Sequence, residues 1–310
     1  MSHVSRSISR LRWALGTAIA LAAATLLWRQ LQSLSLVELH AAWSSTPSSD
    51  IALSVFATAI SFACLAGYEW FATAQVAPGR VPASAALGIG AVAHAIANTL
   101  GFHVLTAGAV RYQAYRTFGL GVGDVTRIVA LVGACVAGGV IAVSSFAIVA
   151  LCMSGDAWRL TFVLVALALL VLAGLAWRAG STKTMLASGA VRKAAALLVL
   201  GAIEMSAAIG ALHVLMPASS LPGPASFVLV YVSAALIGVA SHVPGGIGVF
   251  EAAMLAATPP ANHADVLIAL LAYRAIYNLL PFLLAVLSLL PAALRRRSRL
   301  PGPSDQFDGG

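Results

Sequence analysis

Five charged side chains stand inside long apolar stretches of this sequence, where a charge has to be offset. They are Glu69, Arg111, Glu204, Glu251 and Arg274. On insertion scales a charge at the centre of a membrane helix costs at least about 2.5 kcal/mol, so each one needs a partner or a function. An arginine fork suits a phosphate group, whereas a carboxylate suits an ammonium group. The set favours a polar site for a charged headgroup; the alternative is structural, with Arg274 paired to Glu251 or Glu204 to hold helices together.

Glu69 differs from the other four because it lies nearer one end of its apolar run. From there we expect its carboxylate to reach lipid headgroups and water, so Glu69 is left out of the candidate site. For His94 and His213, a hydrogen bond to the backbone or to a neighbouring helix is the more common role of a lone histidine. His242 is retained, because it stands immediately before a break in the helical pattern.

Two apolar segments are interrupted by residues that break helices. The segment near 83–110 carries Asn98 and a glycine-rich tract, and the segment near 225–257 breaks at Pro244-Gly245-Gly246. Such breaks free backbone polar groups, which is tolerated at membrane depth only where protein or water satisfies them. Glycine also lets a backbone approach a ligand or another helix closely. We therefore predict two broken hairpins, which are either re-entrant or pairs of tilted full spans.

These features belong to a polytopic α-helical membrane protein. Hydrophobic residues make up 60% of the 310 residues and charged residues only 9%, against about 25% charged in soluble domains. The mean hydropathy is +0.94. We predict a membrane domain over 12–294, with about six full spans of roughly 20 residues each besides the two broken hairpins, or eight membrane units in all. The clean apolar runs lie near 12–31, 51–77, 125–153, 159–177, 194–216 and 266–294.

The basic residues predict how the chain is oriented. Fifteen of the eighteen fall in short clusters between apolar runs, all except Arg29, Arg159 and Arg274. If cytoplasmic loops carry the excess of Lys and Arg, both termini are cytoplasmic and the two broken hairpins enter from opposite sides. Opposed broken helices are the mark of inverted-repeat transporters. The segment 1–11 is predicted as a cytoplasmic N-terminus and 295–310 as a disordered cytoplasmic tail.

Other kinds of chemistry find no support in the sequence. Cys64, Cys135 and Cys152 lie in apolar stretches without metal-ligand spacing, so we expect neither a metal nor a cofactor. The closely spaced glycines of GIGVFE follow no strand, and no HExxH, GxSxG or P-loop occurs. The net charge of +8 suits the anionic cytoplasmic leaflet better than nucleic acid.

Three stretches resemble a known family. ANTLGFHVLTAGAVRYQAYRTFGL (Ala97–Leu120) and SHVPGGIGVFEAAML (Ser241–Leu255) look like the signature segments of the lysylphosphatidylglycerol synthase transmembrane family. LLAYRAIYNLLPFLLAVL (Leu270–Leu287) resembles the last helix of that family. The likeness is nearest to the flippase domain of the multiple peptide resistance factors. With Glu204 added from the buried charges, the predicted substrate-binding residues are Asn98, Arg111, Arg116, Glu204, His242, Gly245, Gly246, Glu251, Tyr273 and Arg274.

The resemblance implies a function. In the full-length family a cytoplasmic domain transfers an aminoacyl group from tRNA to phosphatidylglycerol, and the membrane domain moves the product to the outer leaflet. This chain stops about sixteen residues after its last predicted helix, so we expect no synthase domain and no enzyme activity. The expectation is a flippase of the cell inner membrane that moves aminoacylated phosphatidylglycerol or a related lipid, in the service of antimicrobial peptide resistance.

Two other functions stay open at this point. One is a non-transporting membrane partner that docks a separate synthase protein through its basic loops. The other is a membrane-embedded lipid-modifying transferase, for which the short loops leave little room. A second copy of the chain is a further candidate partner, and nucleic acid is not.

Overall fold

The computed structural model describes residues 44, 46–100, 103–152, 190–220, 223–259 and 263–297. Within these residues all regular secondary structure is helical. The predicted spans 12–31 and 159–177, the N-terminal segment 1–11 and the tail beyond 297 lie outside the described residues. The helices are α3 (Ser48–Val76), α4 (Ala83–Leu100), α5 (His103–Tyr115), η1 (Arg116–Phe118), α6 (Val122–Cys152), α9 (Ala190–His213), η2 (Ala218–Ser220), α10 (Pro224–Ala240), η3 (Pro244–Gly246), α11 (Val249–Ala256), α12 (His263–Tyr273), η5 (Arg274–Leu279) and α13 (Leu280–Arg297).

Four of the described helical segments are long and apolar enough to cross a membrane. They are Ser48–Val76, Ala83–Leu100, Val122–Cys152 and His263–Leu289. Leu197–His213 and Pro224–Ala240 are shorter apolar helices. At 1.5 Å per residue, α3 and α6 extend beyond the ~30 Å hydrocarbon core of a bilayer. The prediction of an α-helical membrane protein is confirmed.

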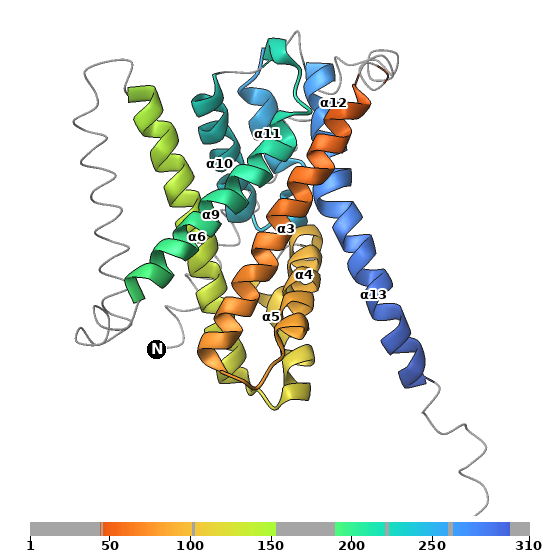
Figure 1. Ribbon diagram of the computed structural model, residues 1–310. Coiled ribbons are helices and arrows are strands. Elements are labelled where there is room, and N and C mark those ends of the chain that lie inside the picture. Colours follow the sequence, from red (N-terminus) through yellow and green to blue (C-terminus); the bar gives the residue numbers. More distant parts are fainter. Residues whose placement is uncertain are drawn as a thin grey trace, which may run out of the picture.

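The two hairpins occupy opposite halves of the molecule. In Figure 1, α4 and α5 fill the lower half and are joined to their neighbours α3 and α6 at the bottom, while α10 and α11 fill the upper half and are joined to their neighbours α9 and α12 at the top. The long helices α3 and α9 cross beside them, and both contact α6. The chain beyond α11 descends through α12, η5 and α13 from the top to the bottom.

Helix backbones touch where glycines face each other. A Cβ atom placed on Gly139 of α6 would lie 2.5 Å from the carbonyl oxygen of Gly201 on α9. Any side chain there would force the two helices apart. Close glycine contacts of this kind stabilise helix pairs in membranes, where the hydrophobic effect no longer drives helices together.

The predicted break after α10 is confirmed. Gly245, Gly246 and Gly248 have φ angles of 62°, 61° and 80°, a region that glycine enters without steric cost. His242 has a φ of 57°, which is uncommon for a residue with a side chain. This left-handed backbone turns the chain between α10 and α11.

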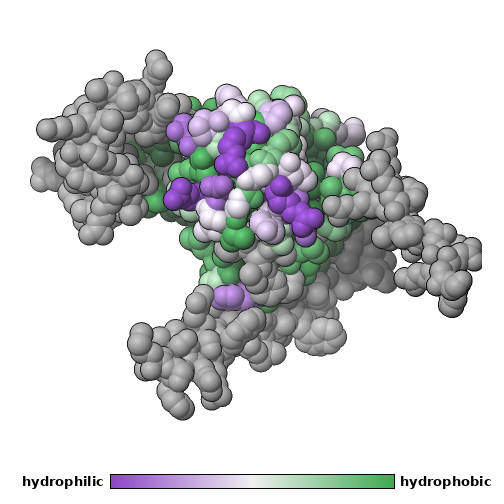
Figure 2. All heavy atoms as spheres, turned by 90° about the horizontal axis from the view of Figure 1, so that it is seen from below, coloured by the Kyte–Doolittle hydropathy of each residue, from purple (hydrophilic) through white to green (hydrophobic). Residues whose placement is uncertain are grey.

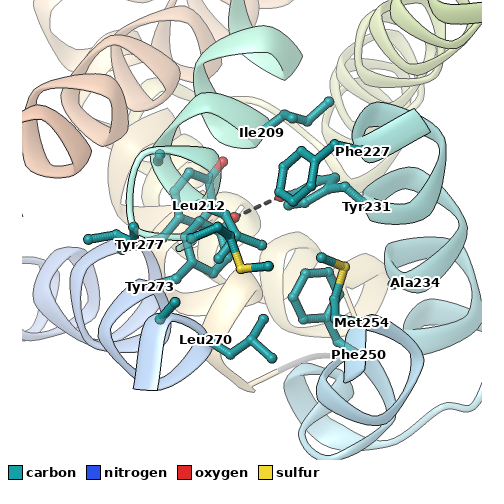
Figure 3. Close-up of a cluster of buried hydrophobic side chains, with 14 of the residues drawn as sticks. Ile209, Leu212, Phe227, Tyr231, Ala234, Phe250, Met254, Leu270, Tyr273 and Tyr277 are labelled. Carbon is teal, nitrogen blue, oxygen red and sulfur yellow. Dashed lines mark hydrogen bonds between the residues drawn. The ribbon is translucent and has the colours of Figure 1, made fainter. Parts of the chain in front are cut away.

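An aromatic core lies between the second hairpin and the helices that follow it. Tyr231 of α10, Phe250 of α11, and Tyr273 and Tyr277 of α12 and η5 approach one another face to edge or stacked, with ring centroids 5.1–6.3 Å apart. Figure 3 shows these rings facing one another, with Met254 beside Phe250. The cluster ties α11 to α12 and so fixes the turn from which α11 starts.

The surface divides into apolar sides and a polar end. Large apolar side chains such as Phe56, Trp70 and Phe146 are at least half exposed, as expected of a lipid-facing surface. Figure 2 shows hydrophilic side chains gathered in the middle of the lower end. Arg116 and Arg127 are exposed in the connections around η1 and the start of α6.

Candidate functional site

The tips of the two broken hairpins meet inside the protein. At the end of α4, the Asn98 carbonyl oxygen accepts a hydrogen bond from Nδ2 of Asn278 at 2.9 Å. The Thr99 hydroxyl donates to the Asn278 carbonyl at 3.1 Å. A Cβ atom on Gly245, in the second hairpin, would lie 2.9 Å from the Thr99 carbonyl oxygen. The two breaks therefore touch each other beside η5. Side chains of η5 bind the backbone carbonyls that the breaks leave free.

The element that joins the tips is itself irregular. Residues Arg274–Leu279 form a π-helix, η5, within the long helical segment that starts at His263. A π-helical turn holds one residue more than an α-helical turn, and such turns are often found at functional sites. Arg274 stands at its beginning, and Tyr277 and Asn278 stand within it.

A buried ion pair ties the first hairpin to α3. Glu69 is completely buried and Arg111 is 2% exposed. Arg111 of α5 donates to the Glu69 carboxylate through Nε at 2.9 Å and Nη2 at 2.7 Å. Tyr115 donates to the same carboxylate at 2.9 Å, and Nη2 of Arg111 lies 3.1 Å from Nε2 of His94. This two-nitrogen geometry is the strong form of an arginine–carboxylate pair.

A second ion pair ties the other hairpin to η5. Arg274 donates from Nε to Oε1 of Glu251 at 2.6 Å. Its Nη1 donates to the Gly245 carbonyl at 2.8 Å and its Nη2 to the Gly246 carbonyl at 3.4 Å. Oε2 of Glu251 accepts from the Gly248 backbone N–H at 2.7 Å, at the N-terminus of α11. Arg274 therefore holds both the charge of the second hairpin and the carbonyls at its tip.

The two ion pairs are arranged with opposite polarity. In the first, the arginine is on the hairpin and the carboxylate is on the long helix; in the second, the carboxylate is on the hairpin. Both guanidinium groups predicted to bind phosphate are bound to carboxylates in this conformation. The structural alternative considered for Arg274, a pair with Glu251, is the arrangement observed. At Arg111 the fork is held by the Glu69 carboxylate, whereas at Arg274 only Nε is held by Glu251 and the two Nη nitrogens are held by backbone carbonyls.

Glu204 is the third buried carboxylate of the site, and it has no basic partner among the described residues. It lies on α9 and is 3% exposed. Ser61 of α3 donates to its Oε1 at 3.0 Å, and the Ser61 oxygen lies 2.8 Å from the Tyr277 hydroxyl. Its other oxygen, Oε2, has no hydrogen-bond partner in the part of the chain that the structure describes.

The structure brings together some of the predicted site residues and separates others. Arg116 is exposed in η1, away from the hairpin tips. His242 is exposed, with Nδ1 2.8 Å from the Ala240 carbonyl. Tyr273 is in the aromatic core, its hydroxyl 2.7 Å from that of Tyr231 (Figure 3). Five predicted residues lie at the contact of the hairpin tips or bind a residue of it: Asn98, Gly245, Gly246, Glu251 and Arg274. Arg111 and Glu204 lie in two other buried clusters.

The expectation that Glu69 reaches water was wrong. Gly90 of α4 packs so closely on α3 that a Cβ atom there would be 2.5 Å from Cβ of Glu69. The first hairpin thus covers Glu69 and excludes solvent. The need for a partner to buried Arg111 was the signal that could have found it, since an uncompensated buried charge is strongly destabilising. Asn278, Ser61 and Tyr115 carried no comparable signal.

The described residues contain no group of three or more His, Cys, Asp or Glu side chains that could hold a metal ion. The chemistry of the site is that of paired charges, hydroxyl groups and backbone carbonyls.

Comparison with known proteins adds one relative. No family model matches the chain. "Uncharacterized protein slr0712" of Synechocystis sp. is 31% identical over 248 residues, which cover 74% of this chain and 75% of the relative. The chain belongs to the family of that protein.

Proposed function

We propose that the protein is a lipid translocase, which moves a phospholipid between the leaflets of the cytoplasmic membrane. The observation that carries the proposal is the contact of two oppositely directed broken hairpins, each tied to a long helical segment by an arginine–carboxylate pair, fully buried at Glu69–Arg111 and partly buried at Glu251–Arg274. Broken helices that meet at the midplane and enter from opposite sides are the arrangement around which alternating-access transporters move. The proposal includes an inverted-repeat architecture with both termini in the cytoplasm. It also places the polar end seen in Figure 2 on the cytoplasmic side of the membrane.

The ion pairs define the class of lipid that fits. Opening a pair leaves a buried arginine and a buried carboxylate, each of which is costly alone. A phosphodiester can take the place of the carboxylate on the arginine, because both present two oxygens to the guanidinium fork. A headgroup that also carries an ammonium group can take the place of the arginine on the carboxylate. A lipid with both charges therefore replaces an opened pair without leaving a charge uncompensated.

This reasoning favours an aminoacylated phosphatidylglycerol or a related lipid. It agrees with the resemblance of Ala97–Leu120 and Ser241–Leu255 to the lysylphosphatidylglycerol synthase transmembrane family. In the proposal Arg111 and Arg274 hold the phosphate in turn, and Glu69 and Glu251 receive the ammonium group. The protein itself catalyses no covalent step, and a separate synthase supplies the lipid.

The proposal is tested in vesicles. Purified protein is reconstituted in liposomes that contain fluorescent phosphatidylglycerol or its fluorescent lysyl ester, and a membrane-impermeant quencher measures the label that reaches the outer leaflet. The wild-type protein is expected to move at least one of the two lipids, and Arg274→Ala to abolish the movement. Arg127→Ala, which removes an exposed arginine of α6, is the matched control and is expected to move lipid at the wild-type rate. No movement of either lipid by the wild-type protein would contradict the proposal.

A second candidate function is a docking partner for a separate synthase. The polar lower end of the molecule, with exposed Arg116 and Arg127, is the observation that favours it. In that case the synthase would co-purify with the wild-type chain and be lost from Arg116→Glu, while neither lipid would move.

A further inference from the structure

Glu204 has the least compensated charge of the described residues. It is 3% exposed, and no Lys, Arg or His of the described residues lies within ion-pair distance of it. Among the described residues, Ser61 donates the only hydrogen bond that the carboxylate receives, to Oε1. An ionised carboxylate buried in this way loses its hydration without a cation in exchange, which costs several kcal/mol, and groups in that position neutralise instead.

The titratable groups near Glu204 come from α3, α10 and η5, and they are uncharged thiol and phenol groups. The carboxylate interacts electrostatically with Cys64 and Tyr68 of α3, Tyr231 of α10 and Tyr277 of η5. Cys135, on α6, interacts with Tyr68 behind them. The cation that acts on Tyr231 and Tyr273 is Arg274, which is paired with Glu251.

The hydrogen bonds at Glu204 form a short directed chain. Ser61 has one hydroxyl proton, and it is donated to Glu204. The Tyr277 hydroxyl, 2.8 Å from the Ser61 oxygen, must then donate to Ser61. Two buried oxygens of the cluster take no part in the chain and have no hydrogen-bond partner: Oε2 of Glu204 and the hydroxyl of Tyr68.

We infer that Glu204 is a proton-binding site, with the proton on Oε2 in the conformation described here. The proton comes from hydronium and returns to water when the cluster opens, so that only the O–H bond of the carboxylic acid forms and breaks. A metal cation fits the cluster poorly, because hard cations such as Mg²⁺ and Ca²⁺ take about six or more oxygen ligands, and among the described residues of this cluster only Oε2 of Glu204 and the Tyr68 hydroxyl are without partners. A proton needs one.

The position of Glu204 gives the proton a consequence for the hairpins. Through Ser61 it contacts α3, which carries Glu69, and through Tyr277 it contacts η5, which carries Arg274. Loss of the proton places a charge between the two elements to which the hairpins are tied. The inference deepens the proposed function and rests on it, because it assigns a proton gradient as the energy source of lipid movement.

Proton binding is measured without lipid movement, so the two proposals fail separately. Purified protein in lipid nanodiscs is titrated across a pH series and followed by infrared difference spectroscopy, in H₂O and in D₂O. A carbonyl band of a protonated carboxylic acid, shifted in D₂O, is expected in the wild-type protein and absent from Glu204→Gln, which keeps the size of the side chain. Asp265→Asn, at an exposed acid of α12, is the control and is expected to retain the band.

A second variant, Ser61→Ala, distinguishes a local effect on the carboxyl group of Glu204 from a general change of fold. Ser61→Ala leaves Glu204 in place but removes its one hydrogen bond, so the carbonyl band is expected to persist at a shifted frequency. A band that is unchanged in Glu204→Gln would overturn the inference. So would displacement of the band by sodium at constant pH, which would mark a cation site. If the band behaves as expected while the wild-type protein moves neither lipid, the proton site stands and the proposed function fails. If lipid moves but a pH gradient does not accelerate it, the assignment of the proton gradient as energy source is overturned.

Discussion

The pair of Glu69 and Arg111 allows the sharpest stability prediction. Replacing Arg111 by methionine removes both nitrogens that bind the carboxylate, at 2.9 Å and 2.7 Å, and leaves Glu69 with the hydrogen bond from Tyr115 alone. Glu69 is fully buried, so water cannot replace the lost partner. Breaking a buried pair in this way costs about 3–5 kcal/mol.

The double variant Glu69→Gln/Arg111→Met separates the pair from the packing. Its neutral side chains of similar size leave no buried charge, so most of the loss should return, and the coupling energy of the double-mutant cycle should be about 2 kcal/mol or more. The cycle is measured by equilibrium unfolding in mixed detergent micelles, followed by the helical circular dichroism signal. The Arg80–Asp124 pair is the comparison, because those side chains are 48% and 29% exposed and about 0–1 kcal/mol is expected.

A cost below about 1 kcal/mol for Arg111→Met would refute this reasoning. Additive single effects, with no recovery in the double variant, would do the same, because the side chains would then act independently.

Two glycine substitutions test the close contacts that form the site. Gly90→Ala should destabilise the protein by about 1–3 kcal/mol in the same unfolding assay, because its Cβ overlaps that of Glu69; Gly88→Ala, on the open face of α4, should be neutral or stabilising, and equal effects would contradict the contact. Gly245→Ala adds a Cβ at a φ of 62°, 2.9 Å from the carbonyl at the tip of the first hairpin, and should lose both stability and lipid movement. Gly79→Ala adds a Cβ at a similar positive φ but with no neighbour, and this variant should keep lipid movement. If the Gly79→Ala protein also lost lipid movement, backbone strain and not the hairpin contact would explain both variants.

Apolarity and helix breakers were enough to predict the elements. The run near 51–77 is α3 at 48–76, and Pro244-Gly245-Gly246 interrupts the helices where the sequence predicted a break. These predictions succeed because a bilayer requires long apolar helices and because proline and glycine act locally. The local conformation of each segment depends on few residues outside it.

The partners of the charges could not be read from the sequence. Glu69 is distant in sequence from Arg111, and its burial depends on how closely α4 packs at Gly90. Asn278 binds the tip of the first hairpin from a π-helical turn, and a single extra residue in a turn leaves no trace in the apolar pattern. Pairing and register are tertiary properties, and they decide which predicted arginines are engaged.

The measurement that tests the central claim most directly is lipid movement by the double variant Glu251→Ala/Arg274→Ala. Removing both charges avoids an unpaired buried carboxylate, and the helical circular dichroism signal and the reconstituted yield, compared with those of the wild type, establish that the variant is folded. With wild-type protein in parallel liposomes, the account predicts rapid transbilayer movement of the labelled lysyl ester by the wild type and none by the folded double variant. Movement at the wild-type rate by the double variant would contradict the account, because the lipid phosphate would then need no arginine at the hairpin contact.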